Sequence, residues 1–172
     1  LITSESNRTL LKAAVDRGVK IRILTNSLGS TDNLEAFSGY QSTRQKLLET
    51  GVQVYEFRPD AKERTKIMTS KLQKTLSHTP IFGLHAKTMV IDEKTTVIGT
   101  FNLDPRSINL NTECLTIIES KEISKGVLKG MDEEFKPENS WETTLQFNPD
   151  SKVSHTKRIK TWTRKIIPKD IL

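Results

Sequence analysis

The pattern of hydrophobic and polar positions is clearest in the middle of the chain, where residues 83–92 and 97–102 predict two short β-strands. The polar run 92–95 between them predicts a turn. Side chains on a strand alternate between its two faces, so His85 and Lys87 should point the same way. The second strand ends in a glycine followed by polar side chains, and glycine lets a ligand approach the backbone closely. The sequence therefore predicts a site on this hairpin.

Helices and strands alternate before the hairpin. Residues 6–17 have the apolar spacing of a helix, with Ser6 as its N-cap, and residues 19–25 alternate as a strand. Asp32 and Glu35 are spaced as the capping box of a second helix. Alternating elements predict an α/β domain, in which ligands bind near the carboxyl ends of the strands.

The remaining elements are less sharply patterned. Residues 52–57 and 112–118 predict strands, and Ser120 predicts the start of a third helix. Near the end of the chain, Ile159 and Trp162 have helical spacing among basic residues. Two interpretations of this last helix stay open: an interfacial helix with an aromatic anchor, and, slightly favoured, a helix docked on a half of the protein that this sequence lacks.

Length and charge limit the class of protein. The 172 residues suffice for one domain, residues 1–150, followed by a basic tail, residues 151–172. The domain holds 20 basic and 20 acidic side chains, whereas the tail holds seven basic side chains and one acid and so carries the net charge of +6. A basic tail indicates an anionic partner or, equally, a solvated end. No apolar run approaches the roughly 20 residues of a membrane span, and the single cysteine excludes an internal disulfide.

Four polar side chains of the hairpin suit an anionic phosphate. The imidazole of His85 can attack phosphorus when neutral or protonate a leaving group when charged. The ammonium of Lys87 and the hydroxyl and amide of Thr100 and Asn102 can bind phosphate oxygens. No set of carboxylate, cysteine and histidine side chains has the spacing of a metal site, so we expect neither a metal nor another cofactor.

The spacing His-x-Lys-x(4)-Asp followed by Gly-Thr-x-Asn resembles the HKD motif of the phospholipase D superfamily. Asn-Leu-Asp-Pro-Arg-Ser at 102–107 and Leu-Asn-Thr-Glu at 110–113 resemble the second HKD half of its bacterial cardiolipin synthase-like branch. The resemblance implies an α/β/α sandwich with a mixed central sheet flanked by helices, and a phosphohistidine intermediate. It also implies that Thr100 and Arg106 bind substrate. Tyr40 and Arg44 share a helix face, for which packing is the default interpretation, and the resemblance adds substrate binding by Tyr40 as the alternative.

Two acids are candidates for orienting His85. Asp92 completes the motif and is therefore a candidate catalytic residue, but it lies an odd number of positions from His85. On a regular strand it faces away, which favours a scaffold role. The resemblance implies that Glu113 holds the other histidine nitrogen, which makes it the better candidate. The alternative for Glu113 is a surface carboxylate at a strand start.

The chain contains one His-x-Lys pair and begins without a methionine, which predicts that it is half of a longer, two-motif protein. In the family that the sequence resembles, two HKD motifs meet, one histidine attacking and the other protonating. By this resemblance His85 is the acid and base rather than the nucleophile. We therefore expect a second HKD half as partner, in the same full-length chain or in a homodimer.

The leading functional hypothesis is an enzyme that cleaves or transfers the phosphodiester of a phospholipid substrate, in a membrane-associated protein of the bacterial cell envelope. One alternative is a metal-independent nuclease that grips nucleic acid with the tail and residues 58–74. An aromatic content of 6% gives little stacking surface, so nucleic acid ranks behind phospholipid. The other alternative is a non-catalytic module that binds lipid or phosphate.

Overall fold

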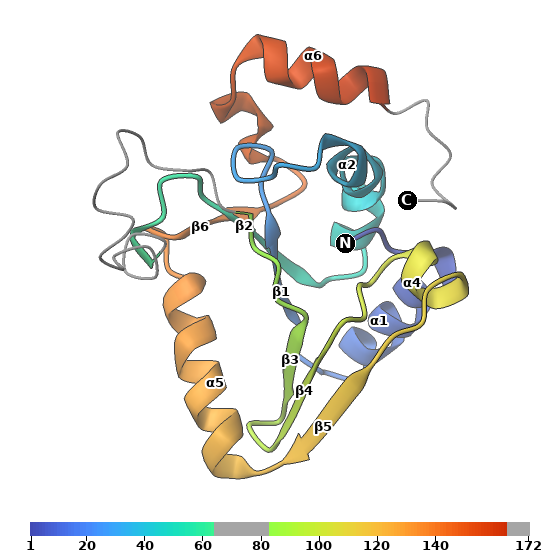
Figure 1. Cartoon of the computed structure of the whole chain (residues 1–172), viewed down its shortest axis with the longest axis vertical. Coiled ribbons are helices and arrows are strands. Elements are labelled where there is room, and N and C mark those ends of the chain that lie inside the picture. Colours follow the sequence, from blue (N-terminus) through green and yellow to red (C-terminus); the bar gives the residue numbers. More distant parts are fainter. Residues whose placement is uncertain (64–82, 165–172) are drawn as a thin grey trace.

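The structure is a computed structural model that describes residues 1–63 and 83–164 (Figure 1). The helices are α1 (Glu5–Asp16), α2 (Leu34–Leu48), α4 (Pro105–Asn109), α5 (Lys121–Glu134) and α6 (His155–Thr163), with a short 3-10 helix η2 (Pro149–Lys152). The strands are β1 (Arg22–Asn26), β2 (Gln53–Phe57), β3 (Thr88–Ile91), β4 (Thr95–Gly99), β5 (Leu115–Glu119) and β6 (Ser140–Thr143).

The first sheet has the strand order β1-β2-β6. β1 and β2 run parallel, with Ile23 opposite Val54, and β6 runs antiparallel to β2. α2 packs against this sheet and buries the apolar side chains whose removal from water drives folding. The buried cluster consists of Leu28, Phe37, Tyr40, Leu47, Val52 and Val54.

The second sheet is an antiparallel meander, β3-β4-β5. The predicted hairpin is present, but β3 begins at Thr88 rather than at residue 83, and β4 begins at Thr95 and ends at Gly99. Its turn is tight: Asp92 and Glu93 have φ of 51° and 54°, the left-handed conformation of the favoured hairpin turns. α5 packs on one face of this sheet (Figure 1), where the buried hydroxyls of Thr96 and Ser124 are 2.8 Å apart.

Helices begin close to the predicted positions, with shifts in the capping residue. Ser120 caps α5 as predicted, its hydroxyl accepting from the backbone N–H three residues later. The cap of α1 is Ser4 rather than Ser6, and that of α2 is Asn33 rather than Asp32. Each pair offers two side-chain oxygens that are equally able to cap a helix, so local sequence does not choose between them.

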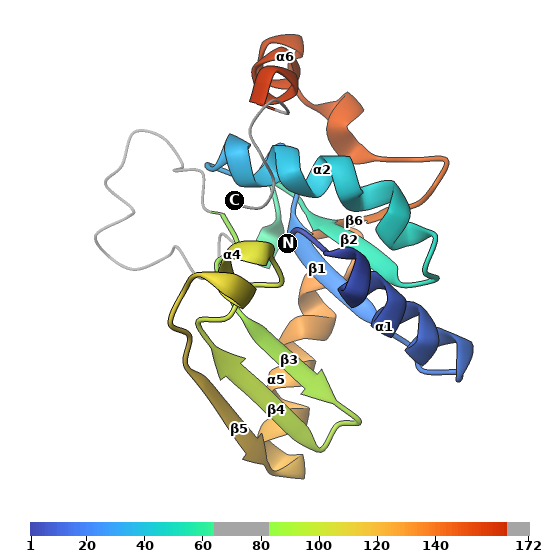
Figure 2. The ribbon, with the colours of Figure 1, turned by 90° about the vertical axis from the view of Figure 1, so that its right-hand side faces the viewer.

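The end of the described chain lies over α2 (Figure 2). In α6, Lys157 Nζ donates to the carbonyl oxygen of Thr31 at 3.1 Å, and Arg164 forms an ion pair with Glu35. The basic tail is therefore attached to the domain as far as it is described. The basic segment 58–74 is described only as far as residue 63, and its residues 64–74 lie outside the described part of the chain.

The predicted α/β class is confirmed, because parallel and antiparallel strands combine with helices. The strands that the structure describes form two three-stranded sheets rather than one continuous sheet. Asn26 at the end of β1 is hydrogen-bonded to Leu84, just before β3, and so links the two sheets. No helix within residues 1–63 and 83–164 is long and apolar enough to cross a membrane.

Candidate functional site

His85 and Lys87 lie in the segment that leads into β3, not on the predicted strand itself. Lys87 Nζ is 2.9 Å from His85 Nε2 and 3.3 Å from the His85 carbonyl oxygen. A lysine ammonium can only donate hydrogen bonds, so in this contact His85 Nε2 is the atom that accepts, provided that its tautomer leaves the lone pair there. The two side chains therefore lie together, as the motif predicts.

The pKa of Lys87 is shifted by its surroundings in the pocket. Partial burial lowers the pKa of Lys87 from its usual 10.5, while the charges of Glu113 and Asp104 act to raise it. Desolvation penalises an ammonium, and nearby carboxylates favour it. The two acids thus support the cationic form that a phosphate oxygen requires.

Asn26 holds the chain immediately before His85. Its Nδ2 donates to the Leu84 carbonyl at 2.8 Å, and its Oδ1 accepts from the Leu84 N–H at 2.7 Å. The Ser30 hydroxyl donates to the same Oδ1 at 3.2 Å. An added Cβ on Gly83 would lie 3.6 Å from Asn26 Nδ2, so the two segments are in contact. The carboxyl end of β1 therefore supports the site, as expected for an α/β domain.

Thr100 joins the end of β4 to the start of β5. Its hydroxyl donates to Glu113 Oε2 at 2.5 Å and accepts from the Cys114 N–H at 3.0 Å. Gly99 permits this approach, since an added Cβ would lie 2.1 Å from the Cys114 carbonyl oxygen. A side chain at position 99 would therefore push the two strands apart at the edge of the pocket.

Glu113 faces the pocket, but its carboxylate is bonded to residues other than His85. Asn111 Nδ2 donates to Oε1 at 3.1 Å, and Thr100 donates to Oε2. Hydrogen bonds from Thr100, Ser107 and Asn111 lower the pKa of Glu113 below its usual 4.5, so the carboxylate is ionised at neutral pH. In the part of the chain that the structure describes, the His85 ring pairs with Lys87, and the orienting role of Glu113 stays a prediction.

Asn102 is positioned through the short helix α4. Asp104 caps this helix by accepting from the Ser107 N–H at 2.8 Å, and the buried Ser107 hydroxyl accepts from the Asn102 N–H at 3.2 Å. Arg106 lies on the exposed side of α4, where its Nε donates to Asn111 Oδ1 at 3.3 Å. Arg106 thus contacts a residue of the pocket without lining the pocket itself.

These side chains open into one pocket of about 670 Å³, a volume typical of small-molecule sites. An imidazole, an ammonium, hydroxyls and carboxamides face this space and can together bind and attack a phosphate. Within residues 1–63 and 83–164, no group of His, Cys, Asp or Glu side chains could hold a metal ion. The lining residues are His85, Lys87, Gly99, Thr100, Asn102, Leu110, Asn111, Thr112 and Glu113.

Asp92 lies at the opposite end of β3 from His85. It is exposed and occupies the left-handed turn between β3 and β4. It does not line the pocket. Its position favours the scaffold role over a catalytic one.

Sequence comparison decides the family. The family described as "Cardiolipin synthase, PLD-like domain" matches residues 1–136. The chain belongs to this family. The pocket therefore belongs to a cardiolipin synthase-like member of the phospholipase D superfamily.

Curated relatives of this cardiolipin synthase-like chain are bacterial. Cardiolipin synthase C of Escherichia coli (strain K12) is 45% identical over 116 residues, which cover 64% of this chain and 23% of that protein. An uncharacterised Helicobacter pylori protein (strain J99) is 33% identical over 136 residues, covering 79% of this chain and 25% of that protein. Cardiolipin synthase 1 of Bacillus anthracis is 26% identical over 158 residues, which cover 92% of this chain and 26% of that protein. The chain thus spans about a quarter of the length of these relatives.

Solved structures agree on the fold. The phospholipase D family member Nuc from Salmonella typhimurium matches with a TM-score of 0.58 at 17% identity, over 83% of this chain and 76% of its own. Phosphatidylserine synthase from Haemophilus influenzae Rd KW20 matches with a TM-score of 0.58 at 12% identity, over 99% of this chain and 39% of its own. Both likenesses show that the cardiolipin synthase-like chain has the phospholipase D fold.

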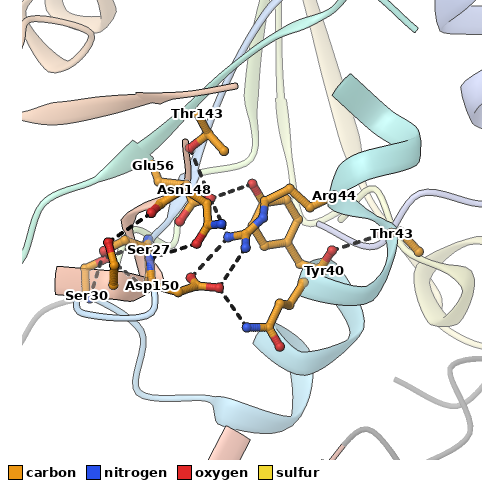
Figure 3. Close-up of polar contacts among 11 residues, drawn as sticks. Ser27, Ser30, Tyr40, Thr43, Arg44, Glu56, Thr143, Asn148 and Asp150 are labelled. Carbon is orange, nitrogen blue, oxygen red and sulfur yellow. Dashed lines mark hydrogen bonds and ion pairs between the residues drawn. The ribbon is translucent and has the colours of Figure 1, made fainter. Parts of the chain in front are cut away.

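Tyr40 and Arg44 share a face of α2, but in this cardiolipin synthase-like domain that face points into the core (Figure 3). Tyr40 Oη donates to Glu56 Oε1 at 3.0 Å, and Arg44 Nη1 donates to the same oxygen at 2.9 Å. Arg44 also donates to both carboxylate oxygens of Asp150, at 3.1 and 2.7 Å. Tyr40 is only 2% exposed and does not line the pocket, so this arrangement gives it a packing role rather than the predicted substrate contact.

The buried network contains a perturbed acid. Burial raises the pKa of Glu56, and the charge of Arg44 and the hydrogen bond from Tyr40 oppose this shift. Glu56 Oε2 has no hydrogen-bond partner among the described residues. Burial also raises the pKa of Tyr40 well above 10, so its hydroxyl stays protonated and donates. Through Arg44 and Asp150, the network ties α2 and β2 to the segment that leads into α6.

Proposed function

We propose that the chain supplies one half of the active site of an enzyme that cleaves or transfers the phosphodiester bond of a phospholipid. The observation that supports this proposal is the convergence of His85, Lys87, Thr100 and Asn102 on one pocket in a cardiolipin synthase-like chain. Because the chain spans about a quarter of its relatives, the activity is that of the whole protein. Because phospholipids reside in membranes, we expect the whole protein to be membrane-associated.

The proposed reaction has two displacements through a phosphohistidine. In the first, a histidine nitrogen bonds to phosphorus while the bond from phosphorus to the leaving alcohol oxygen breaks, and a second histidine gives that oxygen its proton. In the second, water or an alcohol gives a proton to the second histidine and displaces the first from phosphorus. His85 takes one of these roles, with the acid-base role preferred.

The other pocket residues act on the phosphate oxygens. When phosphate binds, the Lys87 ammonium moves its hydrogen bond from His85 Nε2 to a non-bridging oxygen, which frees the imidazole nitrogen. The amide of Asn102 donates a neutral hydrogen bond beside it. Glu113 holds Thr100 in place and supports the charge of Lys87.

The second histidine comes from another HKD half. Within the described residues, His85 is the one histidine that lines this pocket. The partner half lies in the same full-length chain or in a second copy, which would bring two His85 side chains face to face.

The test is phospholipid turnover by the full-length protein in mixed micelles. His85→Ala is expected to lower kcat by about 10²- to 10⁴-fold, the range for loss of a general acid or base. Lys94→Ala, in the exposed turn of the same hairpin, is the control and should retain activity. If the wild-type protein neither releases headgroup nor forms cardiolipin, phospholipid is not the substrate.

Other outcomes point to the two alternatives. DNA cleavage that persists in chelator and disappears in His85→Ala would indicate a nuclease. Lipid binding without turnover, equal in wild type and His85→Ala, would indicate a non-catalytic module. Quenching with detergent at neutral or alkaline pH, which preserves the acid-labile phosphorus–nitrogen bond, followed by mass spectrometry decides whether the phosphoryl group becomes attached to His85 or to the partner histidine.

A further inference from the structure

α6 is attached to the domain by one face, and its other face is uncovered in the described structure (Figure 2). Thr161 is fully buried, and Lys157 donates to the Thr31 carbonyl at 3.1 Å. On the outer face, Ile159 and Trp162 are three positions apart and 62% and 67% exposed. Two large apolar side chains therefore remain in water on a helix that is held in place.

The outer face of α6 borders a recess of about 610 Å³ beside η2. Phe147, from the turn before η2, brings a second exposed aromatic ring to this recess, and His155 and Arg158 bring polar groups from α6. Asp150 also lines the recess, but its carboxylate is already bonded to Arg44. The recess is thus mainly polar, with apolar surface from Phe147, Ile159 and Trp162 and a cation from Arg158.

The segment that carries the outer face is strongly basic. Residues 151–164 contain five Lys and Arg side chains and no Asp or Glu. Lys157 and Arg164 point toward the domain, where they bind a carbonyl and Glu35. The other three are exposed and form no ion pair with a carboxylate of the described chain: Lys152, Arg158 and Lys160.

We propose that the outer face of α6, together with Phe147, is a docking surface for an anionic phospholipid bilayer. Tryptophan favours the headgroup level of a membrane, and basic side chains are attracted to anionic lipid. An amphipathic helix with this composition lies in the plane of the interface with its apolar side chains inserted. A second copy of the chain is a poorer occupant, because a two-fold contact would join two identical basic patches.

The docking surface is separate from the catalytic pocket, with which it shares no lining residue. Bilayer binding therefore does not depend on the proposed function. His85→Ala should bind vesicles as well as wild type, and failure of phospholipid turnover would leave the docking surface intact.

Fluorescence of Trp162 tests the docking surface directly. The sequence has two tryptophans, and Trp141→Phe in the 172-residue chain leaves Trp162 as the reporter while keeping an aromatic ring beside Arg58. With phosphatidylglycerol vesicles, the emission is expected to shift to shorter wavelength and to be quenched by brominated acyl chains. Phosphatidylcholine vesicles should give neither effect, and added salt should weaken binding. An unchanged emission with phosphatidylglycerol, or equal binding to both lipids, would overturn the proposal.

Sedimentation of the chain with the same vesicles gives the second measurement. Replacing Ile159 and Trp162 together with alanine should weaken binding about tenfold or more, and Arg158→Glu should weaken it through charge alone. Leu10→Ala is the matched control, since Leu10 is 70% exposed on α1. If both altered chains bind the vesicles as tightly as the wild type does, the proposal is overturned. A wavelength shift that depends on protein concentration without vesicles also overturns it, because it assigns the face to a protein contact.

Discussion

The side-chain amide of Asn26 forms a pair of hydrogen bonds with the backbone of Leu84, 58 positions further along the chain. The pair resembles the exchange of N–H and C=O bonds between neighbouring strands, except that one partner is a side chain. Ser30, which is fully buried, bonds to the same amide oxygen and fixes its orientation. Because Leu84 precedes His85, the proposed catalytic histidine is attached to the first sheet by this amide.

Asn26→Asp is expected to lower kcat of the full-length protein by about 10- to 100-fold with little change in KM. The aspartate keeps an acceptor for the Leu84 N–H but sets a charged oxygen against the Leu84 carbonyl. His85 is then displaced, although no group that contacts substrate is lost. Steady-state kinetics test this, with exposed Gln53→Ala on β2 as control. An unchanged kcat would show that His85 is held by other contacts.

The pH dependence of activity should carry the signature of Lys87. Burial lowers its pKa from 10.5, so the ammonium loses its proton at a lower pH than an ordinary lysine does. Activity that needs this cation falls as pH rises through the lowered pKa. In Lys87→Arg the guanidinium stays charged, and the alkaline limb of kcat/KM should move to higher pH. Lys94→Arg is the control and should leave the alkaline limb at the same pH. If Lys87→Arg also leaves the limb unchanged, the titration of another group causes the loss of activity.

Gly99 and Gly126 should respond in opposite directions to alanine. At Gly99 the new Cβ meets the Cys114 carbonyl, so Gly99→Ala is expected to lower the free energy of unfolding by about 1–3 kcal/mol and to reduce activity by displacing Thr100. At Gly126 on α5 nothing lies within 4 Å, and Gly126→Ala should raise stability by about 0.5–1 kcal/mol. Urea denaturation followed by circular dichroism measures the free energy of unfolding of both variants. Equal changes in the two variants would contradict the close contact between Gly99 and the Cys114 carbonyl.

Arg44→Leu is expected to lower the free energy of unfolding by about 3–5 kcal/mol, because it leaves Glu56 and Asp150 without their shared cation in the core. The loss should shrink at acid pH, because burial raises the pKa of Glu56 and its protonation removes an unpaired buried charge. Arg17→Leu, on the exposed end of α1, is the control. A loss that does not vary with pH would mean that charge burial is not its cause.

Short-range patterns were sufficient to predict most of the pocket. His85, Lys87, Thr100 and Asn102 all line it, because they flank strands that follow one another and pair directly. Glu113, which the family resemblance indicated, lines it as well. The spacing of a hairpin therefore fixes which side chains meet at its end. The same local reasoning predicted the α/β class and the cap of α5.

Long-range partners could not be predicted in this way. The stripe of Tyr40 and Arg44 on α2 is compatible with a cleft or with a core, and only the position of Glu56 decides between them. A signal was present, because Glu56 shares its strand face with Val54, which is also buried. The bond between Asn26 and Leu84 leaves no periodic trace in the sequence, since a side-chain amide can pair with any backbone.

The meander β3-β4-β5 has a consequence for the order in which the protein folds. Its strands pair with their neighbours in the chain, and such local contacts form quickly. The bonds from Asn26 to Leu84 and from Arg44 to Asp150 span 58 and 106 positions, and each must first close a long loop. Pulsed hydrogen exchange should accordingly protect the amides of β4 before that of Leu84. Lys87, Thr100 and Glu113 thus come together early in folding, and His85 reaches its working position only when the two sheets dock.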